Sequence, residues 1–204
     1  VDTQPFQPDA RCSGGLYFSN LEHIAEYLHY GDLVARVTVP PEACWIQEAV
    51  GKFKADRIIL SDLQPLKDWD LWNEAAFVER AVAVLGLALR YVKHQTPELC
   101  LAAVQQDGLA LKFVKDQTQQ LCLAAVQQIG LALEYVKDQT PEICLAAVQR
   151  NGCALYYVKD QTPEICLAAV QRNGCALKFV KDQTPEICLA AVRQNGWALE
   201  YVRH

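Results

Sequence analysis

The chain has 204 residues, of which 51% are hydrophobic and 21% charged, a composition typical of folded proteins rather than disordered ones. Its net charge of −5 arises within residues 1–70, because acidic and basic side chains balance over residues 71–204. A protein that binds nucleic acid by neutralising phosphates needs a basic surface, so this distribution argues against nucleic acid as a partner. No apolar run approaches the roughly 20 residues that cross a bilayer, which argues against membrane insertion.

Residues 1–62 predict a small α+β domain. The segment GGLYFS (14–19) is typical of a turn that leads into a strand. A helix is predicted over 21–31, where the apolar residues share one face and a glycine ends the segment. LVARVTVP (33–40) alternates as a strand does and stops at two prolines, and FKADRIIL (53–60) predicts a further strand.

Residues 63–72 are predicted to be a linker, in which Trp69 and Trp72 cover the open end of the first repeat. From residue 73 onward the chain repeats itself every 22 residues. Such regular periodicity is typical of stacked repeat arrays. A diverged unit comes first, and five clear units then align on Thr96, Thr118, Thr140, Thr162 and Thr184.

Each unit carries the signals of two short helices. Threonine followed by Pro-Glu, as at 162–164, is a strong helix start. The Asn-Gly pair at 173–174 predicts a helix end at which glycine takes the left-handed conformation, and CALKFVK (175–181) predicts a second short helix. Helices of this length are marginal alone, so stacking must stabilise them. The chain is therefore predicted to be mainly α, with residues 73–204 forming a short α-solenoid of six helical hairpins.

Seven of the nine cysteines follow the repeat rather than a disulfide framework. Equivalent residues of stacked helices lie about 8–10 Å apart, whereas a disulfide needs Cα atoms within about 6.8 Å. The same spacing is too wide for a thiolate zinc site. We therefore expect reduced cysteines that pack in the core, in an intracellular and reducing compartment such as the cytoplasm. The main ladder comprises Cys100, Cys122, Cys144, Cys166 and Cys188.

The units differ mainly around the turn between their two helices. One interpretation is neutral drift at exposed sites, and the other is an edge that binds a partner. Trp197 has a second interpretation as a terminal residue that packs only when a further layer covers it. An aromatic ladder (Phe113, Tyr135, Tyr157, Phe179, Tyr201) is predicted to lie in the core. The candidate binding residues are Asp107, Lys112, Glu134, Tyr156, Lys178 and Trp197.

No catalytic residue, metal site or cofactor is predicted. An acid/base site needs titratable groups brought together, and the front of the chain offers only scattered ones. His23 and Glu26 share a helix face by spacing, which a solvated surface explains as well. Cys12 precedes two glycines that lack phosphate-loop spacing. The full set of candidates is Cys12, Glu22, His23, Glu26, His29 and Asp32.

Two motif groups resemble known families. The combination PF-x-PD-x-x-C-x-GGLYFS, then -EYL-x-YG-, R-x-V-x-VP and FKADRIIL resembles an uncharacterised N-terminal domain of giant-virus and microbial-eukaryote proteins. The unit ALKFVKDQTPEICLAAV is similar to a repeat of unknown function in the same kinds of protein. These resemblances imply no activity, substrate or catalytic residue. The family domain begins further upstream, and the chain starts at Val1 without any methionine, so we expect a piece of a longer protein.

The function predicted from these features is a non-catalytic scaffold for protein–protein interaction or assembly. Self-association through the last repeat is one form that assembly would take. The alternative is an N-terminal domain that binds a small molecule or acts as a transferase, with the repeats recruiting a protein substrate. This alternative rests on a loose resemblance of the front domain to ADP-ribosyltransferase folds, whose residue signature is not evident here.

Overall fold

A computed structural model describes residues 16–20, 23–28 and 32–203. The chain divides into two compact units. The first, which we call the front unit, comprises residues 1–85 and 91–93. The second, which we call the repeat unit, comprises residues 86–90 and 94–204.

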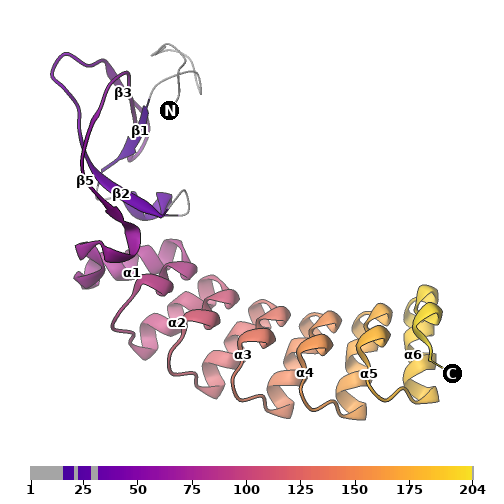
Figure 1. The fold of residues 1–204 in the computed structure, drawn as a ribbon. Coiled ribbons are helices and arrows are strands. Elements are labelled where there is room, and N and C mark those ends of the chain that lie inside the picture. The colour runs from indigo at the N-terminus through magenta and orange to yellow at the C-terminus, as the bar shows by residue number, and fades with distance from the viewer. Residues whose placement is uncertain (1–15, 21–22, 29–31, 204) are drawn as a thin grey trace. The chain divides into compact units, whose positions relative to one another are not determined.

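The described part of the front unit contains two small antiparallel sheets (Figure 1). One sheet has the strand order β1-β4-β3, and the other pairs β2 with β5. The strands predicted after the two glycines of GGLYFS and over LVARVTVP are confirmed as β1 and β2. The strand bounds are β1 Leu16–Ser19, β2 Leu33–Thr38, β3 Trp45–Ala49, β4 Lys52–Ala55 and β5 Ile59–Pro65.

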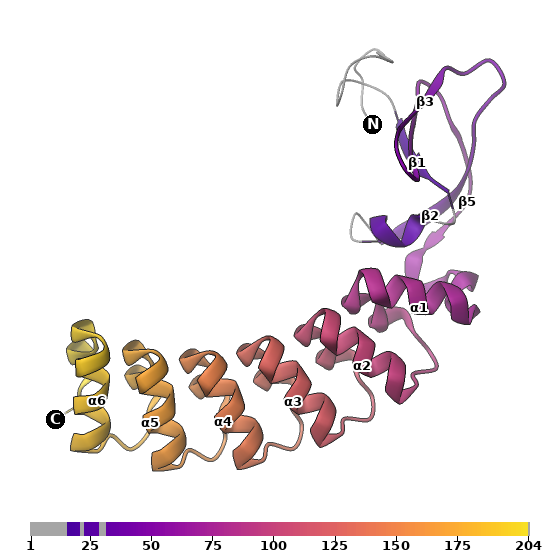
Figure 2. The same ribbon diagram turned by 180° about the vertical axis from the view of Figure 1, so that it is seen from behind.

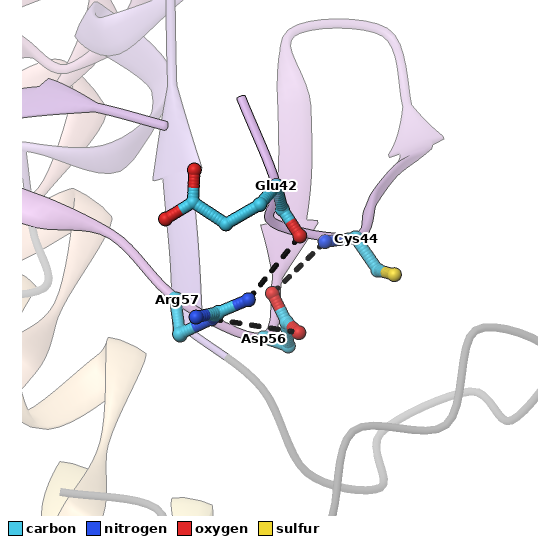
Figure 3. A network of polar contacts seen from close by, with 4 residues as sticks. All are labelled: Glu42, Cys44, Asp56 and Arg57. Atoms are coloured by element: carbon cyan, nitrogen blue, oxygen red, sulfur yellow. Dashed lines mark hydrogen bonds and ion pairs between the residues drawn. The ribbon is translucent and has the colours of Figure 1, made fainter. Parts of the chain in front are cut away.

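The single strand predicted over 53–60 is wrong, because this segment contributes to both sheets as the end of β4 and the start of β5. Two hydrogen bonds between Cys44 and Asp56 mark the break, and Figure 3 shows the one that the Asp56 carboxylate accepts. The Cys44 backbone N–H donates to the Asp56 carboxylate at 3.0 Å, and the Asp56 N–H donates to the Cys44 carbonyl at 3.0 Å. Arg57 then donates to the Glu42 carbonyl at 3.2 Å. These contacts join residues that are 12 to 15 positions apart, so a pattern of neighbouring residues does not predict them.

Strand β3 was not predicted, and the turn after it explains how it pairs with β4. Gly51 lies in this turn with φ +70°, a conformation that favours glycine. A Cβ added to Gly51 would also lie 2.1 Å from the Cβ of His23, so the backbone and His23 approach closely here. The strand itself alternates between half-buried and exposed residues without a strong apolar pattern.

The helix predicted over 21–31 is observed, within the described residues, only as the short 3-10 helix η1 Ile24–Tyr27. The predicted linker is also more ordered than expected, because β5 continues to Pro65 and two 3-10 helices follow, η2 Leu66–Asp68 and η3 Asp70–Asn73. Residues 63–72 are therefore part of the packed front unit rather than a free connection.

Trp72 is the anchor of this segment. Its side chain is 3% exposed, and its indole N–H donates to the Leu66 carbonyl at 2.7 Å. Its ring packs edge-on against Phe77 and stacks on Tyr91, with centroids 5.2 and 5.0 Å away. Trp69 contacts Phe77 from a second side, at 5.4 Å. The prediction that both tryptophans cover the first repeat is confirmed.

From residue 75 to residue 201 the chain alternates ten-residue α-helices with six-residue 3-10 helices. The second helix of every unit is thus a 3-10 helix. In the repeat unit the α-helices pack side by side in one layer and the 3-10 helices in a second (Figures 1 and 2). The α-helices are α1 Ala75–Val84, α2 Pro97–Gln106, α3 Gln119–Gln128, α4 Pro141–Arg150, α5 Pro163–Arg172 and α6 Pro185–Gln194. The 3-10 helices are η4 Gly86–Tyr91, η5 Gly108–Phe113, η6 Gly130–Tyr135, η7 Gly152–Tyr157, η8 Gly174–Phe179 and η9 Gly196–Tyr201.

The predicted helix starts are confirmed. In each clear unit the threonine hydroxyl accepts a hydrogen bond from the backbone N–H three residues on, at 3.2–3.3 Å. Thr118 makes this bond even though its unit lacks Pro-Glu. Local chemistry therefore positions the first turn of α2 to α6 without help from distant residues.

The predicted left-handed glycine at the end of the α-helix is wrong. Within the described residues Gly51 is the glycine with positive φ, and Gly152 instead begins a 3-10 helix capped by the Asn151 side chain. Glycine is required there for another reason. A Cβ at Gly152 would lie 2.5 Å from the carbonyl oxygen of Ala169 in the next unit, well inside van der Waals contact. The missing side chain is what lets consecutive layers approach.

The core of the repeat unit is a ladder of small and branched apolar residues. Ala169 and Val170 of α5, with Ala176 and Leu177 of η8, are fully buried, and so are the equivalent residues of the preceding clear units. In the last unit, by contrast, Leu199 is 66% exposed. Within the described part of the chain, no helix is long and apolar enough to span a membrane.

Candidate interaction surface

The positions that vary between units converge on one face of the 3-10 helices. Because a 3-10 helix has three residues per turn, the residue after each glycine and the residue three further on project to the same side. The later position is exposed in every clear unit. We call Lys112, Glu134, Tyr156, Lys178 and Glu200 the variable row.

Beside the variable row lies the aromatic ladder, which we call the aromatic row: Phe113, Tyr135, Tyr157, Phe179 and Tyr201. The prediction that these rings form the core is wrong, because all five are only half-buried. In η7 the fully buried positions are Ala154 and Leu155, which face the neighbouring layers. Tyr157 lies two residues beyond Leu155, so its ring reaches the surface. The aromatic and variable rows together form what we call the 3-10 face.

The two lysines of the variable row lie over aromatic rings of their own unit and of the next. The Lys112 Nζ is 6.0 Å from the Phe113 ring centroid and 5.5 Å from that of Tyr135. The Lys178 Nζ lies 4.8 and 5.9 Å from the centroids of Phe179 and Tyr201. Cation–π attraction at this range orders a side chain that is otherwise flexible.

Glu134 and Tyr156 bridge consecutive units in the same manner. Desolvation raises the pKa of Tyr135 and of Tyr157, and the Glu134 charge and its hydrogen bond raise both further. The Tyr156 ring packs edge-on against Tyr157 and Phe179, with centroids 5.0 and 5.3 Å away. The 3-10 face is therefore continuous across units, with side chains that are ordered before any partner binds.

The remaining candidate binding residues are Asp107 and Trp197. The Asp107 carboxylate accepts a hydrogen bond from the Leu109 backbone N–H at 2.9 Å, so it caps η5 instead of facing solvent freely. Trp197 is 73% exposed at the start of η9. A Cβ at the adjacent Gly196 would meet nothing within 4 Å. The interpretation of Trp197 as a residue for self-association stays a prediction.

A glutamine ladder that sequence reasoning missed connects the units. Gln139 donates through Nε2 to the Tyr157 carbonyl at 2.9 Å and accepts at Oε1 from the Lys159 N–H at 3.0 Å. Its Oε1 also accepts from the Cys144 thiol at 3.6 Å. Each clear unit has this glutamine directly before its threonine. This recurrence is the sequence feature from which a structural role of the glutamine could have been predicted. The members are Gln95, Gln117, Gln139, Gln161 and Gln183.

The ladder cysteines are free thiols, as predicted, and four of them are buried. Burial raises the pKa of the Cys144 thiol, the charge of Asp160 raises it further, and Lys159 lowers it. The pKa values of the thiols in the neighbouring units are raised by the same leading cause. These thiols therefore stay protonated hydrogen-bond donors near neutral pH.

We expect Cys144 and its buried equivalents to resist alkylation while the exposed Cys44 reacts at once. Because their pKa values are higher in the folded chain than in the unfolded one, their contribution to stability is complete below about pH 8.5 and is lost as pH rises further. Iodoacetamide labelling followed by peptide mass spectrometry, with urea unfolding at pH 7 and 9.5, tests both points. Equal labelling rates for Cys44 and Cys144 would contradict the assignment.

Of the front-unit candidates, the structure describes His23, Glu26 and Asp32. Cys12, Glu22 and His29 lie outside the described residues. A ring nitrogen of His23 lies 2.9 Å from Asn20 Oδ1, and the His23 carbonyl accepts from the Glu26 N–H at 3.0 Å. The Asp32 carbonyl accepts from the Leu66 N–H. The described residues also hold no group of three or more His, Cys, Asp or Glu side chains suited to a metal.

The front unit does contain a cavity of about 480 Å³ between its two sheets. An exposed ion pair, Arg36 to Asp62 at 3.2 Å, lies at its rim, and Asp62 has a positive φ of 53°. Phe18 and Phe53 stack in the wall with centroids 5.4 Å apart. Neither His23 nor Glu26 lines it. The other lining residues are Ser19, Asn20, Ile24, Val34, Ala35, Val37, Gln64 and Trp69.

Comparison with known families identifies part of the repeat unit. Residues 118–162, 140–183 and 162–204 each match the model of a family described as a domain of unknown function, DUF4116. Residues 118–204 are thus similar to DUF4116 repeats. The matches begin 22 residues apart, which confirms the predicted resemblance to a repeat of unknown function for this segment. No curated protein and no solved structure matches the chain. The resemblance of the front unit stays a prediction.

Proposed function

We propose that this chain is a non-catalytic α-solenoid scaffold whose 3-10 face binds a partner protein. One observation carries the proposal. The threonine, glycine and glutamine that recur in every clear unit serve helix capping, close packing of the layers and hydrogen bonds between loops. The variable row, by contrast, lies on one exposed face beside aromatic rings. The free thiols support an intracellular, reducing compartment for this work.

The chemistry of the 3-10 face supports a docking role. Tyrosine supplies large contact area at a low cost in side-chain entropy, and exposed aromatic residues are enriched in interfaces. Tyr156 is 65% exposed although its ring already contacts two others. Because the variable row is held over the aromatic row, binding loses less conformational freedom than it would with free side chains.

The test is affinity capture from a native lysate with three versions of the full chain, followed by mass spectrometry. The first is the parent chain, and the second replaces Lys112, Tyr156 and Lys178 with alanine. The matched control replaces three exposed glutamines on the α-helices, Gln127, Gln149 and Gln171. We expect a partner that the parent and the control retain and the 3-10-face variant loses, at unchanged thermal stability. Identical partner lists for all three chains would reject the proposal.

A second candidate function is binding of a small molecule in the front unit, with the repeats recruiting a protein substrate. The observation that favours it is the cavity, whose size and apolar aromatic walls with a few polar groups are typical of ligand sites. Calorimetric titration with NAD⁺, and a thermal-shift screen of nucleotides and aromatic acids, would test it. The expected result is saturable binding that Phe53→Ala abolishes. Binding unchanged by that substitution would place the ligand elsewhere.

A further inference from the structure

We infer that the segment bound by the 3-10 face is a polyproline II helix with acidic residues nine positions apart. This inference rests on the proposed docking role of the 3-10 face and adds the chemistry of the partner. Two independent features carry it. They are the charge order of the variable row and the match between the repeat spacing and the period of polyproline II.

The charges of the variable row follow a definite order along the chain. Along the chain the row has a cation at Lys112, an anion at Glu134, an aromatic ring at Tyr156, a second cation at Lys178 and a second anion at Glu200. The ligand we infer spans the first four of these positions. The ion pairs found among the described residues include neither lysine. Both ammonium groups lie over rings, which fix their positions and leave their donors for a ligand. A complementary segment therefore presents acid, base, apolar residue and acid in that order.

The spacing of the row selects the backbone conformation of the ligand. Packed helices lie about 8–10 Å apart, so consecutive residues of the variable row follow at about 9 Å. Polyproline II rises about 3.1 Å per residue with three residues per turn, so every third residue returns to the same side after about 9.3 Å. In a β-strand every second residue returns to the same side after about 6.6 Å, which does not match a spacing of about 9 Å. Of these two conformations, polyproline II is the one that places a residue opposite each of the four positions.

The aromatic row supplies the second half of the recognition. Half-exposed rings recur once per unit beside the variable row. The Tyr156 ring packs edge-on against two of them, and the Lys178 Nζ lies 5.9 Å from the Tyr201 centroid. Proline-rich segments bind surfaces lined by such rings, since the preformed polyproline II helix loses little entropy on docking. Prolines between the charged positions would pack on Tyr135, Tyr157 and Phe179. The predicted motif is acid-x-x-base-x-x-apolar-x-x-acid with proline at most intervening positions.

The test uses fluorescein-labelled peptides and fluorescence anisotropy with the full chain. The matched peptide is DPPKPPLPPD, and the charge-swapped peptide is KPPDPPLPPK. A third peptide has one extra proline before the last acid and so shifts it out of register. We expect the matched peptide to bind about ten times more tightly than either of the others, an effect in line with a few exposed ion pairs.

A charge-swapped chain makes the test reciprocal. The chain carrying Lys112→Glu, Glu134→Lys and Lys178→Glu is expected to prefer the swapped peptide, whereas a control with Arg172→Glu and Arg193→Glu on the α-helices keeps the parent preference. Equal affinities for all peptides, or no binding at millimolar concentration, would overturn the inference. Those outcomes leave the docking role standing if the alanine variant still loses its captured partner, so the two failures are distinguishable.

Discussion

Replacing Gly152 with alanine is expected to lower the free energy of unfolding by about 2–3 kcal/mol. The new Cβ would lie 2.5 Å from the Ala169 carbonyl oxygen and 2.9 Å from the Asn173 Cβ, both on the next unit. One of these contacts is backbone, which cannot rotate away as a side chain can. The layers must therefore separate, and the overpacking penalty applies at a place where the core is fully buried. Urea unfolding followed by far-UV circular dichroism measures the change.

Gly196 is the matched control, because it occupies the same position of its unit and has nothing within 4 Å of an added Cβ. Gly196→Ala is expected to leave stability unchanged or raise it by up to about 1 kcal/mol, since alanine is the better helix former. Equal losses for Gly152→Ala and Gly196→Ala would show that the glycine serves its own backbone conformation rather than the approach of the next layer.

Replacing Gln139 with alanine is expected to cost about 2–3 kcal/mol. The substitution removes the partners of the Tyr157 carbonyl, the Lys159 N–H and the Cys144 thiol at once. Each polar group left partly buried without a partner costs on the order of 1 kcal/mol. The loss should appear as a lower urea midpoint with an unchanged dependence on denaturant, because the folded layers remain in place.

The control for Gln139 is Gln149, an exposed glutamine near the C-terminal end of α4 in the same unit. Gln149→Ala removes a side chain of the same size from the surface and is expected to change stability by less than about 0.5 kcal/mol. A similar small effect at Gln139 would mean that solvent replaces the ladder bonds without cost. The glutamine ladder would then be a consequence of stacking and not a cause of it.

The sequence predicted local structure more accurately in the repeat unit than in the front unit. In the repeat unit, Thr162 and its equivalents were recognised as helix caps because capping depends on residues three positions apart. In the front unit, the break between β4 and β5 was missed because it depends on the contact of Asp56 with Cys44, which is 12 residues away. The strand β3 was missed because its half-exposed residues give a weak alternating pattern.

The candidate surface shows the same division. Lys112, Glu134, Tyr156 and Lys178 were identified from variation between units, and the structure places them on one face. Asp107 was grouped with them because it is near in sequence, yet its carboxylate caps η5. The aromatic row was assigned to the core because large rings at a fixed period usually are buried. Its half-exposed position depends on the turn angle of a 3-10 helix rather than an α-helix.

By itself the sequence determined the repeat length, the helix starts and the apolar face of each clear unit, because these depend on contacts within a few residues and recur five times. Only the tertiary structure decided what the invariant glycine and glutamine do and where the aromatic row lies. Gly152 and Gln139 act on atoms about 17 to 20 residues away, in the following layer or loop. Such contacts exist only after the layers stack. An invariant residue in a repeat does not by itself show which neighbouring residue it contacts.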